Sequence, residues 1–230
     1  MTPTMGIPCV SFVPLGILYE NRYFISDECL TCLTEINARI NCEDPITRPL
    51  RRTLIFFDVL HKDLFPILIH IKKNPRIFRS TIKLLVWMTI PVSCLISAQQ
   101  EKSRQSSSAN INFMKNEFTQ FLYNAKETFL YLKITRIVLE HLNSLTLNQP
   151  LISKDDCELV SYLLLLIRNI LHAPERPTSK NTDYDGDCGN TSDYPQQRQL
   201  LGVLFAQGFG QILIHLLSCS QKVILFDKNL

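Results

Sequence analysis

Basic residues at helical spacing are the first candidates for binding chemistry. Arg76, Arg79 and Lys83 follow one another at intervals of three and four residues, which places their side chains on one face of a helix. A second basic group comes earlier in the chain and consists of Arg48, Arg51 and Arg52. Two neighbouring basic faces could bind the phosphates of duplex DNA. An ordinary solvated face is the alternative, because no aromatic residue on that face is placed to stack on a base.

Motifs that could bind a metal ion are incomplete. Cys29 and Cys32 form a CxxC pair, but a zinc site needs about four ligands, and no second CxxC or pair of histidines follows. The acidic stretch DYDGD at 183–187 resembles a calcium loop, yet its glycine is misplaced and Tyr194 stands where the bidentate glutamate belongs. We therefore predict buried thiols, a solvated acidic loop and no bound metal.

Motifs for catalysis or for phosphate cofactors are also missing. The stretch GFG at 208–210 follows no predicted strand and lacks the third glycine of a nucleotide-binding loop, so it indicates a break between helices. The five histidines are scattered among predicted helices. No nucleophile has a base at a recognisable spacing. We expect no catalytic residue, no cofactor, no small-molecule substrate and no enzymatic activity.

Composition sets broad limits on the class of protein. The chain has 230 residues, of which 46% are hydrophobic, and its net charge of +3 does not by itself require a polyanionic partner. Eight cysteines show no regular spacing, and we expect reduced thiols in a cytosolic or nuclear protein. The most apolar stretch, residues 84–98, is interrupted by Pro91 and is shorter than the about 20 residues of a membrane span. It is predicted to be a buried helix, and we expect no membrane association.

The positions of these residues depend on the helices that carry them, and apolar periodicity predicts helices along most of the chain. Asn74 and Pro75 form a helix start, and Pro66 and residues 125–128 are predicted weak points. We see no alternation typical of strands. Residues 99–111 form a predicted polar loop, and residues 174–198 form a predicted disordered acidic loop. The predicted helices cover residues 27–41, 50–73, 75–89, 113–147, 153–172, 199–207 and 211–220.

The spacing of these helical units favours an all-α fold. They recur about every 40 residues, as in a HEAT or armadillo type α-solenoid, and a compact helical bundle is the alternative. The last helical stretch, residues 212–217, is strongly apolar, whereas the terminal repeat of a solenoid has a polar outer face. We therefore expect a right-handed solenoid truncated at its C-terminal end, either as an N-terminal fragment or as an incomplete gene model.

One stretch carries a family resemblance. LLLLIRNILHAPE at 163–175 resembles the signature helix of the Timeless family. Other matches follow the family's order: LGILYENRY at 15–23, EDPITRPLRRTL at 43–54, DLFPILIHIKKNPRIFRSTIKLLV at 63–86 and LFAQGFGQILIHLLSCS at 204–220. The resemblance covers nearly the whole chain. Trp87 and Met88 depart from the family pattern, which affects only local packing.

The resemblance implies a fold and a function. It implies that residues 1–230 form the armadillo-like N-terminal domain of a non-enzymatic scaffold in the nucleus. Such scaffolds protect replication forks and support the S-phase checkpoint, and they bind a Tipin-like partner and replicative helicase or other replisome components. A circadian-clock regulator that works with Period is the alternative within the family. An armadillo-type adaptor for a peptide ligand is a third hypothesis, independent of the resemblance.

Four residues of the signature stretch are candidates for a structural role: Arg168, Asn169, His172 and Pro174. Inside a solenoid, Arg168 and Asn169 could turn towards a neighbouring repeat and donate hydrogen bonds to the free carbonyls at helix ends. We predict that this pair is an inter-repeat clamp, and direct contact with a partner is the alternative. Loss of the Arg168 side chain is then expected to cost about 1–3 kcal/mol of stability.

Overall fold

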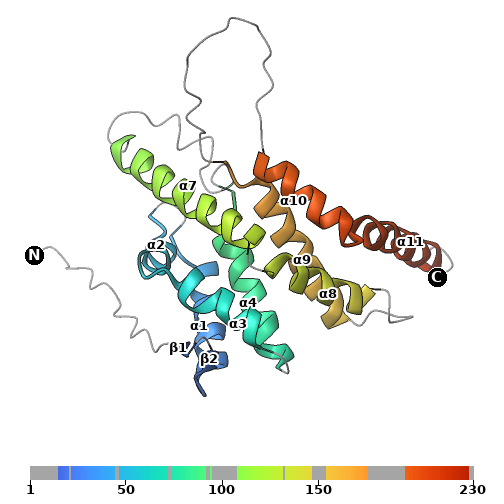
Figure 1. Cartoon of the computed structure of the whole chain (residues 1–230), viewed down its shortest axis with the longest axis horizontal. Helices are drawn as coiled ribbons and strands as arrows, with labels where there is room; N and C mark the ends of the chain where they lie inside the picture. Colours follow the sequence, from blue (N-terminus) through green and yellow to red (C-terminus); the bar gives the residue numbers. More distant parts are fainter. Residues whose placement is uncertain are drawn as a thin grey trace, which may run out of the picture.

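The computed structural model describes residues 15–20, 22–44, 47–71, 74–91, 94, 108–131, 133–146, 154–175 and 195–227. This part of the chain is mostly helical, as predicted for an all-α protein (Figure 1). The repeat geometry of a right-handed solenoid stays a prediction. The elements are β1 (Gly16–Tyr19), β2 (Arg22–Ile25), α1 (Cys29–Asn41), α2 (Pro49–Phe56), the π-helical turn η1 (Leu60–Leu64), α3 (Phe65–His70), α4 (Pro75–Met88), α7 (Ser108–Tyr131), α8 (Ile134–Thr146), α9 (Lys154–His172), α10 (Pro195–Ala206) and α11 (Phe209–Asp227).

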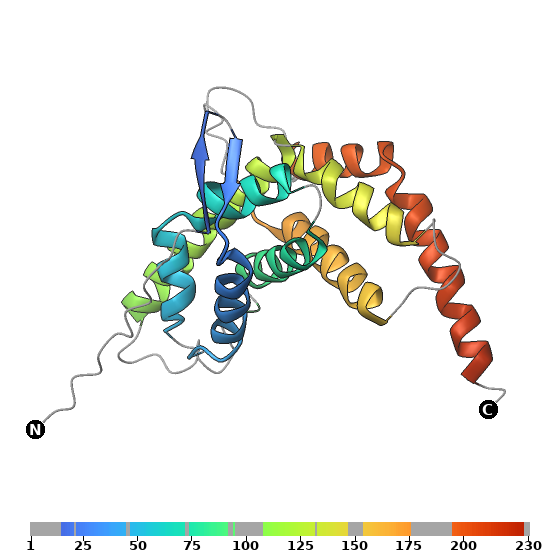
Figure 2. The same ribbon diagram turned by 90° about the horizontal axis from the view of Figure 1, so that it is seen from below.

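Helix α4 lies in the centre of the fold. Its start is the predicted one, because the Asn74 Oδ1 accepts the backbone N–H groups of Arg76 at 3.1 Å and Ile77 at 3.3 Å, and Pro75 occupies the first turn. Its apolar residues Leu84 and Leu85 are fully buried. Helices α1 and α9 pack on either side of it, and the three run next to one another in Figure 2. The apolar stretch that begins at residue 84 is therefore core in its described helical part.

The hairpin of β1 and β2 was not expected from the sequence. The strands are antiparallel and pair Gly16 with Ile25 and Tyr19 with Arg22. Each has only four residues, too few for a visible alternation of polar and apolar side chains. Gly16 is required by close packing, since a Cβ there would collide with the Phe24 carbonyl oxygen. The prediction that the chain contains no strands was therefore wrong for residues 16–25.

Two predicted helix breaks lie elsewhere in the structure. The chain leaves α2 at Phe57, and Asp58 takes a positive φ of 53° before η1 begins. Pro66 does not break a helix but sits in the first turn of α3, where no backbone N–H is needed as a donor. The second break follows Tyr131, so residues 125–128 lie inside α7.

Both predicted loops are shorter than expected at their C-terminal ends. Helix α7 begins at Ser108, and α10 begins at Pro195, where Pro is favoured because it needs no donor partner. Within the second loop, Glu175 is ordered by hydrogen bonds to α10. Residues 99–107 and 176–194, which include the acidic stretch at 183–187, lie outside the described residues.

Helices α10 and α11 meet at the predicted glycine break. Gly208 has a φ of 86°, which suits glycine, whereas Gly210 continues α11. Side chains of Ile214 and Leu217 are 67% and 65% exposed. No single described helix is long and apolar enough to cross a membrane; only α10 and the first part of α11, bent by 66°, meet the length and composition criteria as a pair.

Candidate interaction sites

The EDPITRPLRR stretch forms a buried ionic cluster at the start of α2. The Glu43 carboxylate accepts the backbone N–H of Arg51 at 3.1 Å, and one of its oxygens lies 3.4 Å from the Arg51 Nε and 3.8 Å from the Arg48 Nη1. Thr47 donates its hydroxyl to Asp44 at 3.1 Å in the same turn. Glu43 therefore occupies the positive end of the α2 dipole and neutralises two arginines.

Burial controls the ionisation of this cluster. It lowers the pKa of Arg51 to about 10, although attraction to Glu43 acts in the opposite direction. It also raises the pKa of Glu43, against the pull of the Arg51 backbone N–H and the two guanidinium groups. Arg51 remains charged at neutral pH, but its side chain is only 1% exposed. The prediction that Arg51 contacts DNA phosphates is therefore corrected: the residue is a structural ion-pair partner.

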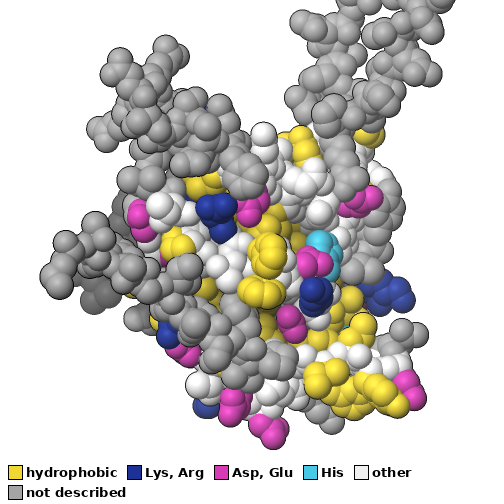
Figure 3. Space-filling model, turned by 90° about the vertical axis from the view of Figure 1, so that its left-hand side faces the viewer, with side chains coloured by type: hydrophobic (Ala, Val, Ile, Leu, Met, Phe, Trp, Pro, Cys, Tyr) yellow, Lys and Arg dark blue, Asp and Glu magenta, His cyan; other side chains and the backbone are white. Residues whose placement is uncertain are grey.

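The other predicted basic residues point to different neighbours. Arg52 lies 3.0 Å from the Glu117 carboxylate on α7, whereas Arg79 lies 3.6 Å from Asp155 and 3.9 Å from Asp156 at the start of α9. Figure 3 shows dark-blue side chains beside magenta ones on the side of the molecule that carries α2 and the start of α7. The predicted pair of basic faces is thus partly neutralised.

Two basic residues on α4 have neighbours other than carboxylates. Arg76 is exposed in the first turn of the helix. The Lys83 Nζ lies 5.5 Å from the centre of the Tyr162 ring, a cation–π contact with α9. Contact of Arg48, Arg52, Arg76, Arg79 and Lys83 with DNA stays a prediction.

Asn169 of the signature helix connects α9 to the end of α4. Its side chain is 0% exposed, and its Nδ2 donates to the Val86 carbonyl at 3.1 Å and to the Thr89 hydroxyl at 3.4 Å. The Val86 carbonyl belongs to the last turn of α4, where no later helical N–H is available. Asn169 thus contacts a helix end, as the predicted clamp requires, whereas a role of the pair between repeats stays a prediction.

Arg168 has a smaller part in this arrangement than expected. It is exposed, and its Nη2 donates to the Asn169 Oδ1 at 3.0 Å. This bond leaves the Asn169 Nδ2 pointing towards α4, so Arg168 orients the clamp rather than forming it. His172 is exposed in the last turn of α9, and Pro174 follows the end of that helix.

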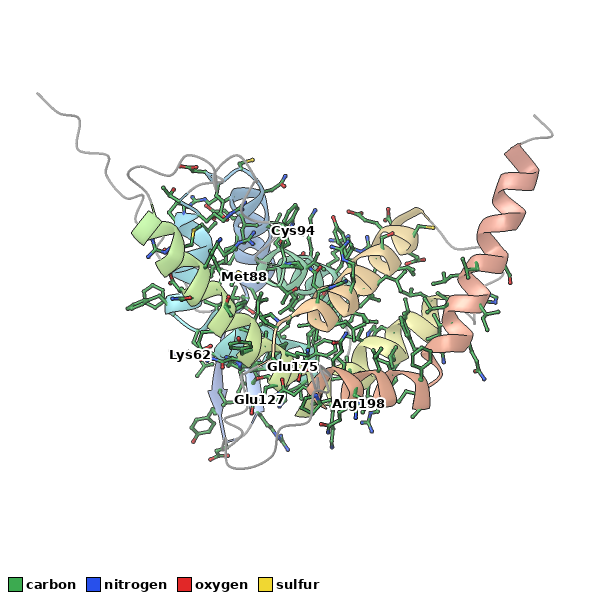
Figure 4. All side chains as sticks on the ribbon, turned by 90° about the horizontal axis from the view of Figure 1, so that it is seen from above. Lys62, Met88, Cys94, Glu127, Glu175 and Arg198 are labelled. Atoms are coloured by element: carbon green, nitrogen blue, oxygen red, sulfur yellow. The ribbon has the colours of Figure 1, made fainter. Side chains whose placement is uncertain are left out.

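A second polar clamp, between Lys126 and Glu175, was not predicted from the sequence. The buried Lys126 Nζ donates to the Ala173 carbonyl at 2.9 Å and to the Glu175 carboxylate at 3.2 Å. The Glu175 carboxylate also accepts the backbone N–H groups of Gln196 at 3.2 Å and Gln197 at 2.5 Å. Helices α7, α9 and α10 meet at this carboxylate (Figure 4). A lone lysine in an otherwise apolar helix face was the available signal.

A chain of hydrogen bonds links Asp58, His61 and Thr128. The Asp58 carboxylate lies 2.5 Å from the His61 Nδ1, and the His61 Nε2 lies 2.9 Å from the Thr128 Oγ1. The order of groups is that of a catalytic triad, but the carboxylate of such a triad is buried, whereas the Asp58 side chain is 46% exposed. This geometry supports a structural role, because the hydrogen bonds connect the turn at Asp58, before η1, to Thr128 on α7.

No group of three or more metal-ligating side chains occurs in the described ranges. Cys29 is buried, and burial raises the pKa of its thiol to about 11. Cys32 is half-buried, and both thiols are free. The prediction of buried thiols therefore holds for Cys29 but not for Cys32.

A pocket with a volume of about 380 Å³ opens where α1, α4 and α9 meet. Its walls include Asn37 and Asn41 from α1, Lys83 and Trp87 from α4, and Tyr162 from α9. Among these residues, only Lys83 was predicted from the sequence to take part in binding. The others come from helix faces whose meeting depends on the tertiary fold.

Comparisons with known proteins identify the family. The family model described as "Timeless protein" matches residues 22–228. The chain is 30% identical to "Protein timeless" of Drosophila melanogaster over 92% of its length, and 28% identical to "Protein timeless homolog" of Homo sapiens and of Mus musculus over 90%. It spans 15% of the fly protein and 16% of each mammalian protein. These matches cover the signature helix, the ionic cluster and both clamps, and the chain belongs to the Timeless family.

Proposed function

We propose that this chain is the helical part of a non-enzymatic scaffold that protects stalled replication forks in the nucleus and supports the S-phase checkpoint. The observation that carries the proposal is the match to the Timeless family model over residues 22–228. Its partners are a Tipin-like protein and components of the replicative helicase, as expected from the family resemblance. Arg48, Arg52, Arg76 and Arg79 form the proposed contact with duplex DNA.

The chemistry of the described residues supports a scaffold. Several of its charged and polar side chains form hydrogen bonds with backbone groups at helix ends of the same chain. Examples are Lys126, Glu175 and Asn169. Such bonds fix the angles between helices and present their outer faces rigidly to partners. A rigid helical surface suits protein binding better than it suits a reaction that needs a nucleophile and a base.

A regulator of the circadian clock is the second candidate function. The chain matches the fly protein and the mammalian homologues at nearly equal identity, 30% and 28%, which supports both functions expected for the family. Both candidates are scaffolds with the same fold, and they differ in their partners.

Affinity purification from S-phase nuclei tests the proposal. The tagged chain is expected to recover the Tipin-like protein and helicase subunits, with an unrelated helical protein carrying the same tag as control. Recovery of Period without replisome proteins would support the clock function instead. Recovery of neither set would contradict both candidates.

A further inference from the structure

Two residues that line the pocket between α1, α4 and α9 carry buried polar atoms that no described group satisfies. Asn37 is 7% exposed, and its Nδ2 donates to the Leu33 and Ser80 carbonyls, both at 2.9 Å. Its Oδ1 accepts no hydrogen bond, and the Trp87 Nε1 donates none, within the described part of the chain. A buried polar group without a partner lowers the stability of the fold. A ligand that offers one N–H and one carbonyl would recover this stability, and a peptide unit carries both.

The spacing of the amides fits an extended peptide. Asn37 and Asn41 lie one helical turn apart on α1 and both border the pocket. One turn advances about 5.4 Å along a helix, and two residues of an extended chain advance about 6.6 Å. A strand that runs along α1 therefore brings two alternate peptide units near Asn37 and Asn41, and the Asn37 Oδ1 can accept a peptide N–H.

The charge at the pocket favours an acidic ligand. Arg79, one turn before Lys83 on α4, is paired with Asp155 and Asp156. Lys83 pairs with no carboxylate among the described residues, and its ammonium rests against the Tyr162 ring. A cation–π contact between partly exposed side chains is weak. The flexible lysine stem can therefore exchange this contact for an ion pair with a ligand carboxylate at little cost.

From these observations we propose that the groove between α1, α4 and α9 binds an extended acidic segment of a partner protein. Backbone groups of the segment satisfy Asn37 and Trp87, and an Asp or Glu side chain pairs with Lys83. The unsatisfied atoms lie beneath the surface, so side chains at the mouth of the pocket move as the segment enters. The proposal names a class of partner for the scaffold and in that sense rests on the proposed function.

Trp87 provides a direct readout, because it is the only tryptophan in the chain. The full chain is immobilised and exposed to a library of short random peptides, and retained peptides are sequenced and titrated while Trp87 emission is followed. We expect enrichment of Asp and Glu among the retained peptides and a saturable change in Trp87 emission. Retained peptides without an acidic bias, or binding that leaves Trp87 emission unchanged, would overturn the proposal.

Charge reversal tests the assigned residue. Lys83→Glu should weaken binding of the acidic peptides about tenfold, since attraction is replaced by repulsion. Lys133→Glu is the matched control, because Lys133 is exposed before α8 and outside the pocket; it should leave affinity unchanged. Lys83→Gln replaces the first variant if urea unfolding shows that Lys83→Glu is unfolded.

Four further results separate the peptide groove from a DNA site and from the proposed scaffold function. Equal affinity of the wild type and the Lys83 variant for acidic peptides would refute the groove. Duplex DNA that changes Trp87 emission while acidic peptides do not would assign the groove to nucleic acid and refute a peptide ligand. If a Lys83 variant that no longer binds acidic peptides still recovers replisome proteins, the scaffold function stands and the groove serves a different partner of the acidic class. If no peptide binds and the purification recovers neither set of partners, both proposals fail.

Discussion

Replacement of Asn169 by alanine tests whether the clamp between α9 and α4 stabilises the fold. The substitution removes the two hydrogen bonds that the Nδ2 donates to the Val86 carbonyl and the Thr89 hydroxyl. The Val86 carbonyl then keeps only the Thr89 hydroxyl, at 3.4 Å. At a site with no solvent access, water cannot take the place of the missing donor.

The expected loss of stability follows from these hydrogen bonds. A buried acceptor left without a good partner costs about 1–3 kcal/mol, and the small cavity left by the amide adds about 1 kcal/mol. We expect Asn169→Ala to lower the free energy of unfolding by about 2–4 kcal/mol, against a total of about 5–15 kcal/mol for a typical domain. The melting temperature should fall by about 10 °C for a chain of this size.

Urea unfolding followed by circular dichroism measures the change, with Arg168→Ala as the matched control. Because Arg168 is exposed and its guanidinium donates to the neighbouring Asn169 rather than to another helix, its loss should cost less than about 1 kcal/mol, below the range that the sequence alone suggested. A larger loss for Arg168→Ala than for Asn169→Ala would refute the assignment of the clamp. Equal stability of wild type and Asn169→Ala would refute the clamp itself.

Three further predictions follow from single positions. Gly208→Ala should destabilise by about 1 kcal/mol in urea unfolding, because a φ of 86° strains an alanine, whereas the exposed helical Gly202 should gain stability on the same change; equal effects would contradict the reasoning. Burial raises the pKa of Asp63 above its unfolded value of 3.8, so the folded state binds the proton more tightly and this residue's contribution to stability declines as pH rises from 3.8 through the folded pKa. The stability of wild type relative to Asp63→Asn should therefore rise on acidification, and a difference that is independent of pH would be inconsistent with it. Arg76→Gln should weaken binding to unrelated DNA duplexes equally and reduce the log–log salt slope by about one unit for each phosphate that is no longer bound, as judged by fluorescence anisotropy with Lys133→Gln as control; unchanged affinity and slope would exclude Arg76 from the interface.

Features with local signals could be predicted from the sequence. The start of α4 depends on Asn74 and Pro75, which are adjacent in the chain, and the break at Gly208 depends on one residue. The end of α9 before Pro174 is similarly local. In each case, the residues that start or end the helix lie within one helical turn of the boundary.

Features that depend on distant partners could not be predicted. The hairpin is held by the Tyr23 hydroxyl, which donates to Asp63 forty residues later, at 2.5 Å. Helix α7 continues through residues 125–128. In this stretch Lys126 donates hydrogen bonds to the Ala173 carbonyl and the Glu175 carboxylate, which follow α9. Arg51 has the same sequence pattern as the exposed arginines, and only the position of Glu43 shows that it is buried.

The Glu175 carboxylate has a consequence for protein engineering. It joins the end of α9 to the first backbone N–H groups of α10 and thereby fixes the distance between the two ends of the stretch at residues 176–194. Closing a loop costs only about 0.6 kcal/mol more for each doubling of its length. A fluorescent reporter domain inserted into this stretch would therefore be carried by the scaffold with little effect on the helices, provided that Glu175 and Lys126 are kept.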